Sequence, residues 1–415
     1  MAVLKAFKAI RPTPELASKI AALPYDVMNT MEARKEVKGN PYSFLHVDKA
    51  EIDLDPSVDI YDKKVYEKAK ENLNMMLEKG WLIKDKQERL YIYKQVMVEH
   101  EQIGLVGCVS VDDYINNNIK KHENTRADKE QDRINHVKYC NANTGPIFLM
   151  YKEEKEVNEI IKGWIRDNLP VYDFTSEDGI NHFVWTIENQ DIIDKLICLF
   201  KNIDSLYIAD GHHRAASAVK VAMMKREENP SYTGEEEFNY FLGVLFPHNQ
   251  LKIMDYNRVV KDLNGYDTDT FLEKVGEKFV VERYDGKGQY KPERKHVFGM
   301  YLNNRWYKLT AKEGTFNDKS TLESLDVSIL QNNLLSPILG IKDPRTDERI
   351  DFVGGIRGLD ELEKRVEEGM AVAFSLYPTS VEDLMKIADQ GKVMPPKSTW
   401  FEPKLRSGLF IHELE

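Results

Sequence analysis

Four side chains that can do chemistry stand together in the run Asp210-Gly211-His212-His213-Arg214. The run offers a carboxylate, two imidazoles and a forked guanidinium that suits phosphate or carboxylate. Its glycine allows backbone angles that other residues avoid, which predicts a sharp turn. A turn at the start of a helix presents backbone N–H groups and the positive end of the helix dipole, and both favour an anion. The run therefore predicts a phosphate-binding turn, and a structural aspartate that caps the helix is the alternative.

A second polar cluster contains His122, Glu123, Thr125 and Arg126. It places an acid–base pair beside a hydroxyl and a phosphate-type donor. It is not the zinc motif HExxH, because position 126 is arginine. The other interpretation is an exposed helix face, since a run of charges usually forms one.

Two further segments carry candidate side chains. The loop around Pro24 and Tyr25 presents Asp26, which can also cap a helix expected over 29–37. The proline-rich segment 394–408 is too aromatic for simple disorder. We expect it to be ordered over the core, with Lys397, Ser398, Thr399 and Lys404 near a polar site. A surface strand with solvated lysines is the alternative.

The elements around these residues predict an α/β fold. Residues 206–209 are typical of a buried strand, and the alanine-rich stretch 212–225 of a helix. Short strands alternate with longer helices along much of the chain. The sequence predicts three parts. Residues 1–256 form an α/β core with a mixed sheet and the polar motifs, and residues 257–325 form a smaller α+β lobe. Residues 326–415 form a C-terminal α/β segment, with an ordered tail, that completes the core.

Local patterns predict individual elements. An amphipathic helix is expected over 61–80, ended by Gly80. Asn303-Asn304 predicts a hairpin turn. A turn leading into a strand is expected over 40–47, and we expect 250–256 to pair with the strand over 238–246.

The composition excludes several classes of protein. The 415 residues carry a formal net charge of −11, which disfavours nucleic acid as the main partner. Cys108, Cys140 and Cys198 are odd in number and far apart, which fits a reducing compartment. No apolar run approaches the length of a membrane span, which is about 18 residues. We therefore expect a cytoplasmic protein without a membrane partner, and the sequence leaves the oligomeric state open.

Four blocks of sequence resemble the bacterial and archaeal family catalogued as domain of unknown function 1015. The resemblance covers essentially the whole chain, and the blocks occur in the family's order. The blocks are Pro24-Tyr25-Asp26-Val27, Lys121-His122-Glu123-Asn124-Thr125 with residues 128–133, Ile208-Ala209-Asp210-Gly211-His212-His213-Arg214-Ala215-Ala216, and residues 394–404 with Ser407-Gly408.

The run Asp210 to Arg214 is also similar to the phosphate-binding box of the ParB/sulfiredoxin fold. That superfamily includes nucleotide-binding partition proteins, sulfiredoxins and kinases of free serine. A sulfiredoxin requires a cysteine in this turn, where His212 and His213 stand instead. A partition protein requires a basic helix-turn-helix, and the sequence contains no recognisable one. The resemblance to the serine kinases remains.

This resemblance implies a nucleotide-dependent small-molecule kinase that phosphorylates free L-serine to O-phosphoserine with ATP or ADP and Mg²⁺. The catalytic candidates are Asp26, His122, Glu123 and Asp210, of which Asp210 and Glu123 are also the metal candidates. The candidates for binding phosphate or nucleotide are Gly211, His212, His213, Arg214, Arg126 and Lys397. We expect all of these segments to line one pocket.

Two other functions stay open at the level of sequence. A metal-dependent hydrolase is one, with ligands drawn from His122, Glu123, His136, Asp210, His212 and His213. A non-catalytic nucleotide-binding regulator is the other. The sequence does not decide whether the protein is an enzyme.

Overall fold

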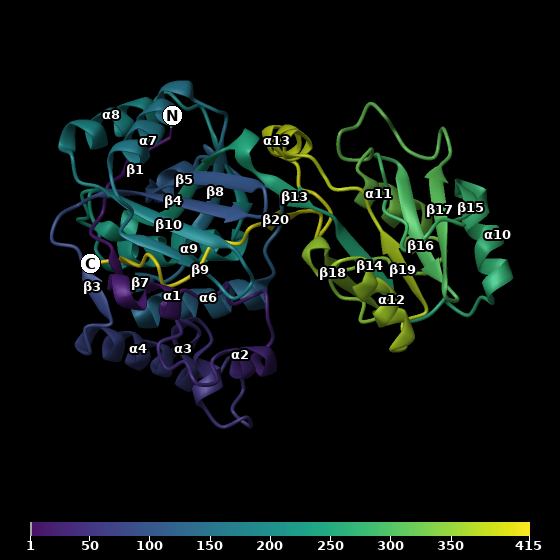
Figure 1. The fold of residues 1–415 in the computed structure, drawn as a ribbon, viewed down its shortest axis with the longest axis horizontal. Coiled ribbons are helices and arrows are strands. Elements are labelled where there is room, and N and C mark those ends of the chain that lie inside the picture. The colour runs from purple at the N-terminus through teal and green to yellow at the C-terminus, as the bar shows by residue number, and fades with distance from the viewer. Residues whose placement is uncertain (1) are drawn as a thin grey trace. The chain divides into compact units, whose positions relative to one another are not determined.

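The computed structural model describes residues 2–415, and the chain forms two compact units (Figure 1). The first unit contains the residues up to Leu251 together with Pro403–Glu415, and the second contains Lys252–Glu402. No helix among residues 2–415 is both long and apolar enough to cross a membrane.

A nine-stranded mixed sheet organises the first unit, in the order β6-β11-β8-β12-β5-β4-β10-β9, with β1 also paired to β5. The pairs β12–β8 and β11–β6 are parallel and the other pairs are antiparallel. The predicted α/β class with a mixed sheet is therefore confirmed. The strands are β1 (Leu4–Lys5), β4 (Leu90–Met97), β5 (His100–Ser110), β6 (Ile119–Lys120), β8 (Ile147–Tyr151), β9 (Tyr172–Thr175), β10 (Asn181–Ile187), β11 (Leu206–Asp210) and β12 (Tyr240–Pro247).

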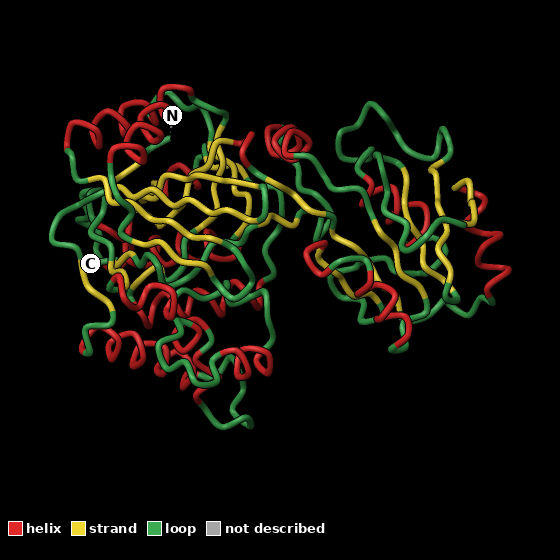
Figure 2. Tube along the Cα trace, viewed as in Figure 1, coloured by secondary structure: helices red, strands yellow, loops and turns green. Residues whose placement is uncertain are grey.

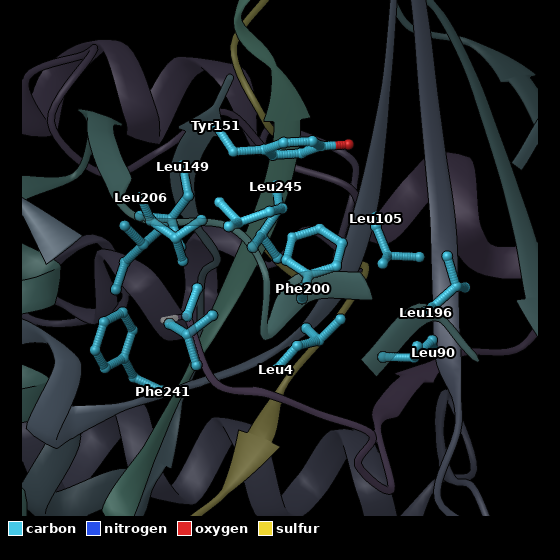
Figure 3. Packing of buried hydrophobic residues seen from close by; sticks show 14 of the residues in the cluster. Leu4, Leu90, Leu105, Leu149, Tyr151, Leu196, Phe200, Leu206, Phe241 and Leu245 are labelled. Atoms are coloured by element: carbon cyan, nitrogen blue, oxygen red, sulfur yellow. The ribbon is translucent and has the colours of Figure 1, made fainter. Parts of the chain in front are cut away.

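Helices cover both faces of this sheet. In Figure 1, α7 (Lys155–Asp167) and α8 (Gln190–Phe200) lie together on one side, and α4 (Lys63–Glu78) and α6 (Ala127–Cys140) lie on the other. The long helix α9 (His212–Glu228) packs against α6. Every residue of β8 is buried, as expected for a strand covered on both faces. Figure 3 shows the resulting core, where Leu245 lies beside Phe200 of α8, and Leu149 and Leu206 belong to the same cluster.

The helix α4 confirms the prediction of an amphipathic helix over 61–80. Asp62 caps its N-terminus by accepting from the Lys64 N–H group at 2.9 Å. Its buried face includes Val65, Leu73 and Met76. Gly80 follows the last turn with φ +68°, a conformation that glycine adopts without strain.

The prediction of a turn leading into a strand over 40–47 is wrong about the strand. This stretch contains the short helix α3 (Leu45–Asp48), preceded by a turn in which the Leu45 N–H group donates to Ser43 Oγ at 3.3 Å. Phe44, Leu45 and Val47 are all buried in one apolar cluster, so burial rather than alternation determines the local structure.

The second unit has a six-stranded sheet in the order β15-β17-β16-β19-β14-β18. Asn303 and Asn304 form the predicted hairpin turn between β16 and β17, with φ of 50° and 57°. The strands are β14 (Tyr256–Val260), β15 (Phe279–Arg283), β16 (Val297–Leu302), β17 (Arg305–Ala311), β18 (Ile350–Gly354) and β19 (Val372–Ser375). The helices are α10 (Thr268–Lys278), α11 (Asp326–Leu330), α12 (Asp360–Glu367) and α13 (Val381–Asp389).

The second unit extends well past residue 325, where the lobe was expected to end. The reason is pairing at long range, because β18 and β19 both pair with β14. Only residues 403–415 of the C-terminal part belong to the first unit. Figure 2 shows helices and strands in each unit.

The predicted pairing of 250–256 with 238–246 is wrong. Both edges of β12 are occupied, by β5 on one side and β8 on the other. The strand β13 (Lys252–Met254) pairs instead with β20 (Trp400–Glu402).

Candidate functional site

The predicted turn joins β11 to α9. Gly211 has φ +93° and precedes the first residue of the helix, so the predicted strand, glycine turn and helix are all present. A Cβ atom added at Gly211 would lie 3.2 Å from the Nε atom of Arg214. Glycine is therefore required at position 211 for two reasons. The backbone conformation favours it, and the Arg214 guanidinium occupies the space that a Cβ atom would need.

Asp210 is held by a lysine from the C-terminal tail. Its Oδ2 atom accepts from Lys404 Nζ at 2.9 Å, and its Oδ1 atom accepts from the Gly211 N–H group at 2.9 Å. Burial alone would raise the pKa of this carboxyl, but the ammonium of Lys404 and the guanidinium of Arg214 outweigh it and hold the pKa well below its usual range. Asp210 is therefore ionised at neutral pH. The tail supplies a side chain to the turn, and that side chain is Lys404.

The loop that contains His122 and Arg126 packs on the turn and contacts both histidines of the turn, His212 and His213. The His122 backbone N–H group donates to His212 Nε2 at 3.5 Å, and the two rings lie edge to face with centroids 4.4 Å apart. The Arg126 backbone N–H group donates to His213 Nε2 at 3.0 Å. Two polar clusters that are far apart in sequence therefore lie together.

His122, Glu123 and His212 form a cluster that can hold a metal ion. Each offers one ligand atom, and these atoms lie within 4.8 Å of one another. Burial lowers the pKa of His122 to about 4 and holds that of His212 well below its usual range. Both imidazoles are therefore neutral near pH 7, which is the form that binds metals. Asp210, the other predicted metal ligand, is engaged by Lys404 rather than included in this cluster.

These buried histidines predict how stability depends on pH. The unfolded chain protonates His122 near its ordinary pKa of about 6.5, whereas the folded protein does so only near 4. Between these values the unfolded state binds more protons, so the free energy of unfolding falls as the pH falls, by up to about 1.4 kcal/mol per pH unit for one histidine. We expect His122→Gln to reduce this slope in urea unfolding measured from pH 7 to pH 4. His248→Gln is the control, and an unchanged slope in His122→Gln would contradict the burial argument.

Another polar cluster, formed by Asp48, Arg133, His136 and Thr144, lies near Arg214, and it was not predicted as a site from the sequence. The Thr144 hydroxyl donates to Asp48 Oδ1 at 2.8 Å and lies 3.1 Å from His136 Nε2. The Arg133 guanidinium lies over the Tyr25 ring, 4.1 Å from its centroid. His136, named above as a candidate metal ligand, belongs to this cluster and not to that of His122 and His212. The available signal was the spacing of Arg133 and His136, which share one face of α6.

The remaining predicted residues lie in different settings. Asp26 is exposed and follows the buried Tyr25. The Arg126 side chain is exposed and pairs with Asp128 at 2.9 Å. Lys397 is an exposed residue of the second unit, and its carbonyl accepts from Arg258 at 2.9 Å. The participation of these three side chains in one site stays a prediction.

Comparison with known proteins gives the family. A model of the family described as "Protein of unknown function (DUF1015)" matches residues 4–328. The chain belongs to this family. Three of the four resembling blocks lie inside the match, and the block at 394–404 lies beyond it. No curated protein matches the chain.

Three solved structures are distantly similar to this chain. A conserved hypothetical protein from Pyrococcus furiosus has 14% identity and a TM-score of 0.37, over 74% of this chain and 94% of its own. A free serine kinase in complex with AMP has 14% identity and a TM-score of 0.37, over 73% and 90%. SbnI from Staphylococcus aureus, truncated at its C-terminus, has 10% identity and a TM-score of 0.39, over 74% and 87%.

Proposed function

We propose that this protein is a nucleotide-dependent small-molecule kinase whose phosphate-binding element is the turn at 210–214. The observation that supports it most is the docking of the loop at 122–126 on the first turn of α9 through His212 and His213. This contact gathers carboxylates, imidazoles and a guanidinium at one helix N-terminus. Phosphoryl transfer depends mainly on such positioning and on charge stabilisation.

Arg214 supports phosphate as the ligand of this turn. It stands in the first turn of α9, where the helix dipole disfavours a cation. Its NH1 group donates to the Pro146 carbonyl at 2.6 Å, and its buried Nε atom makes no hydrogen bond to any part of the chain that the structure describes. Asp210 offsets part of the positive charge. A phosphate at the helix N-terminus would accept from the remaining guanidinium N–H groups and from the backbone.

The transfer step uses an acceptor hydroxyl and a carboxylate base. The hydroxyl oxygen attacks the terminal phosphorus of the nucleotide, and the bond from that phosphorus to the bridging oxygen breaks. The hydroxyl proton passes to the Glu123 carboxylate, with Asp26 as the other candidate base. The leaving group is ADP when ATP is the phosphate donor, and AMP when ADP is the donor. We propose free L-serine as the acceptor, which gives O-phosphoserine.

Mg²⁺ is the metal that we propose for this reaction, because it prefers carboxylate oxygen and neutralises phosphate charge. Glu123 offers such an oxygen beside the turn, and Asp26 is the base if Glu123 binds the metal. Asp210 already accepts from Lys404 and Gly211, so it binds a metal through its remaining lone pairs or after one of these bonds opens.

Arg214→Lys tests the phosphate-binding turn. Lysine keeps the charge but loses the fork, so we expect the affinity for ATP or ADP to weaken by about 1.5–3 kcal/mol, the value of a hydrogen bond to a charged group. That is a loss of about 10- to 150-fold, measured by isothermal titration calorimetry. Loss of the bond to Pro146 should lower the free energy of unfolding by only about 1 kcal/mol.

The matched control is Arg226→Lys at the other end of the same helix. Arg226 pairs with Asp112, with 2.7 Å between NH1 and Oδ1. We expect this variant to bind nucleotide like the wild type. Early melting of Arg214→Lys with unchanged nucleotide affinity would show that Arg214 is only structural.

A metal-dependent hydrolase is the second candidate, favoured by the cluster of His122, Glu123 and His212. Two imidazoles and a carboxylate suit zinc or manganese better than magnesium. Elemental analysis of protein purified without an affinity tag separates the two functions. A stoichiometric transition metal that is lost in His212→Gln favours the hydrolase, and its absence from the wild type favours the kinase.

We propose a reducing compartment for the protein, which agrees with the cytoplasm. Cys108, Cys140 and Cys198 form no disulfide in the described chain. Burial raises the pKa of the Cys140 thiol to about 12, which keeps this thiol protonated and unreactive.

A further inference from the structure

Two glutamines face each other inside the large sheet of the first unit. Gln95 of β4 and Gln102 of β5 are directly opposite in the register of the two strands, and both residues are fully buried. The Gln102 Nε2 group donates to Gln95 Oε1 at 2.9 Å. A buried amide needs hydrogen bonds to offset the water that it loses, so the other partners of this pair indicate its role.

The other partners belong to the C-terminal tail, residues 403–415 of the first unit. Gln95 Nε2 donates to the Lys404 carbonyl at 2.8 Å, and Gln102 Nε2 donates to the Pro403 carbonyl at 3.2 Å. The pair therefore binds two successive peptide carbonyls of the tail. Because both contacts go to the main chain, they fix the position of residue 404 without specifying its side chain.

The glutamine pair is not arranged for stability alone. Gln102 Oε1 is buried and accepts no hydrogen bond from any residue that the structure describes. An unpaired buried acceptor costs free energy, and apolar side chains of similar shape would avoid that cost. Natural proteins break such packing rules mainly where function requires a fixed arrangement. The arrangement that is fixed here is the position of residue 404.

Lys404 reaches the phosphate-binding turn from the tail. Its side chain is 10% exposed, and its Nζ atom lies 2.9 Å from Asp210 Oδ2. The other oxygen of the same carboxylate accepts from the Gly211 N–H group at 2.9 Å. An ionised carboxylate at the turn repels phosphate unless a cation neutralises it. A phosphate ligand therefore requires the Lys404 ammonium to stay in place.

We propose that Gln95 and Gln102 are positioning residues of the phosphate-binding turn, and that they act through Lys404. Their amides bind the main chain of the tail, the tail places the ammonium, and the ammonium neutralises Asp210 beside the N-terminus of α9. The consequence for nucleotide binding rests on the proposed function. The effect on Asp210 itself does not, so the two can be tested separately.

Gly211 is a reporter that needs no nucleotide, because its N–H group donates to Asp210. In protein labelled with ¹³C-carbonyl aspartate and ¹⁵N-glycine, only the three Asp–Gly pairs at 178–179, 210–211 and 285–286 give a coupled NMR signal. We expect Gln95→Leu to shift the Gly211 signal at pH 7 in the direction in which Lys404→Met shifts it. In the Lys404→Met background, Gln95→Leu should move this signal no further.

An unchanged Gly211 signal in Gln95→Leu, or an equal shift with and without Lys404→Met, overturns the proposal. Gln102→Leu also removes the unpaired Oε1 atom, and it should shift the Gly211 signal in the same direction. It gives the same test if Gln95→Leu does not fold.

The affinity for ADP, measured by calorimetry, is the second readout. We expect Gln95→Leu to bind ADP about tenfold more weakly, as is typical when a side chain that supports a binding group is removed. This loss should disappear in the Lys404→Met background. Gln331→Leu is the matched control and should bind ADP like the wild type, because Gln331 Nε2 also donates to a backbone carbonyl at 2.8 Å, that of Ile341 in the second unit.

Two outcomes separate this proposal from the proposed function. Equal weakening of ADP binding by Gln95→Leu with and without Lys404→Met would indicate a general loss of structure and contradict the role through Lys404. A wild type that binds no ADP, together with the expected Gly211 shifts, would reject the kinase and retain Gln95 and Gln102 as residues that position Lys404 on Asp210.

Discussion

Glu123→Gln is expected to lower kcat for phosphate transfer by about 10²–10⁴, the usual contribution of a general base. Glutamine preserves the shape of the side chain but accepts no proton. Nucleotide affinity should change much less, because the phosphate donors belong to Arg214 and the backbone of α9. Initial rates of phosphate-ester formation with saturating nucleotide and L-serine measure the effect.

The control for this variant is Glu227→Gln, at the exposed end of α9. It should have the activity of the wild type. If Glu123→Gln also retains full activity, the base is not Glu123. In that case Asp26→Asn should show the loss of kcat instead. Full activity in both variants would contradict the assignment of a carboxylate base near the turn.

Lys404→Met is expected to lower the free energy of unfolding by about 2–3 kcal/mol. Removing one partner of a fully buried ion pair costs about 3–5 kcal/mol, because the other charge stays behind unpaired. The Lys404 side chain is 10% exposed, but that of Asp210 is 30% exposed, so water compensates part of this loss. Urea unfolding at pH 7 gives the difference.

The double variant Lys404→Met/Asp210→Asn tests the cause of that loss. Asparagine removes the stranded charge, so we expect the double variant to be more stable than Lys404→Met alone. A single variant that unfolds at the same urea concentration as the wild type would mean that the ion pair contributes nothing to folding. Equal stability of the single and double variants would assign the loss to the packing of the lysine stem instead.

The turn itself could be predicted from the sequence because its determinants are local. An apolar run, Asp210-Gly211 and an alanine-rich stretch specify strand, turn and helix within a few residues of one another. The partner of Asp210 could not be chosen in the same way. Lys404 lies 194 residues further along the chain, and only the folded tail distinguishes it from Lys397.

The cluster of Asp48, Thr144 and His136 could not be predicted from the sequence for a related reason. Asp48 directly follows the stretch 40–47, where a turn leading into a strand was expected, and it ends the helix α3 instead. Thr144 is an ordinary residue until packing places its hydroxyl on Asp48 and beside His136. The extent of the second unit likewise depends on strand pairing between distant segments, which no local pattern specifies.

The proposed kinase transfers a phosphoryl group to a small hydroxyl compound. Phosphorus NMR of the protein with Mg²⁺, L-serine and either ATP or ADP follows this transfer. We expect a new phosphate-monoester signal that grows as the terminal phosphate of the nucleotide disappears, one ester for each nucleotide consumed. Intact nucleotide would indicate a non-catalytic regulator, release of inorganic phosphate alone would indicate a hydrolase, and either result would contradict the kinase.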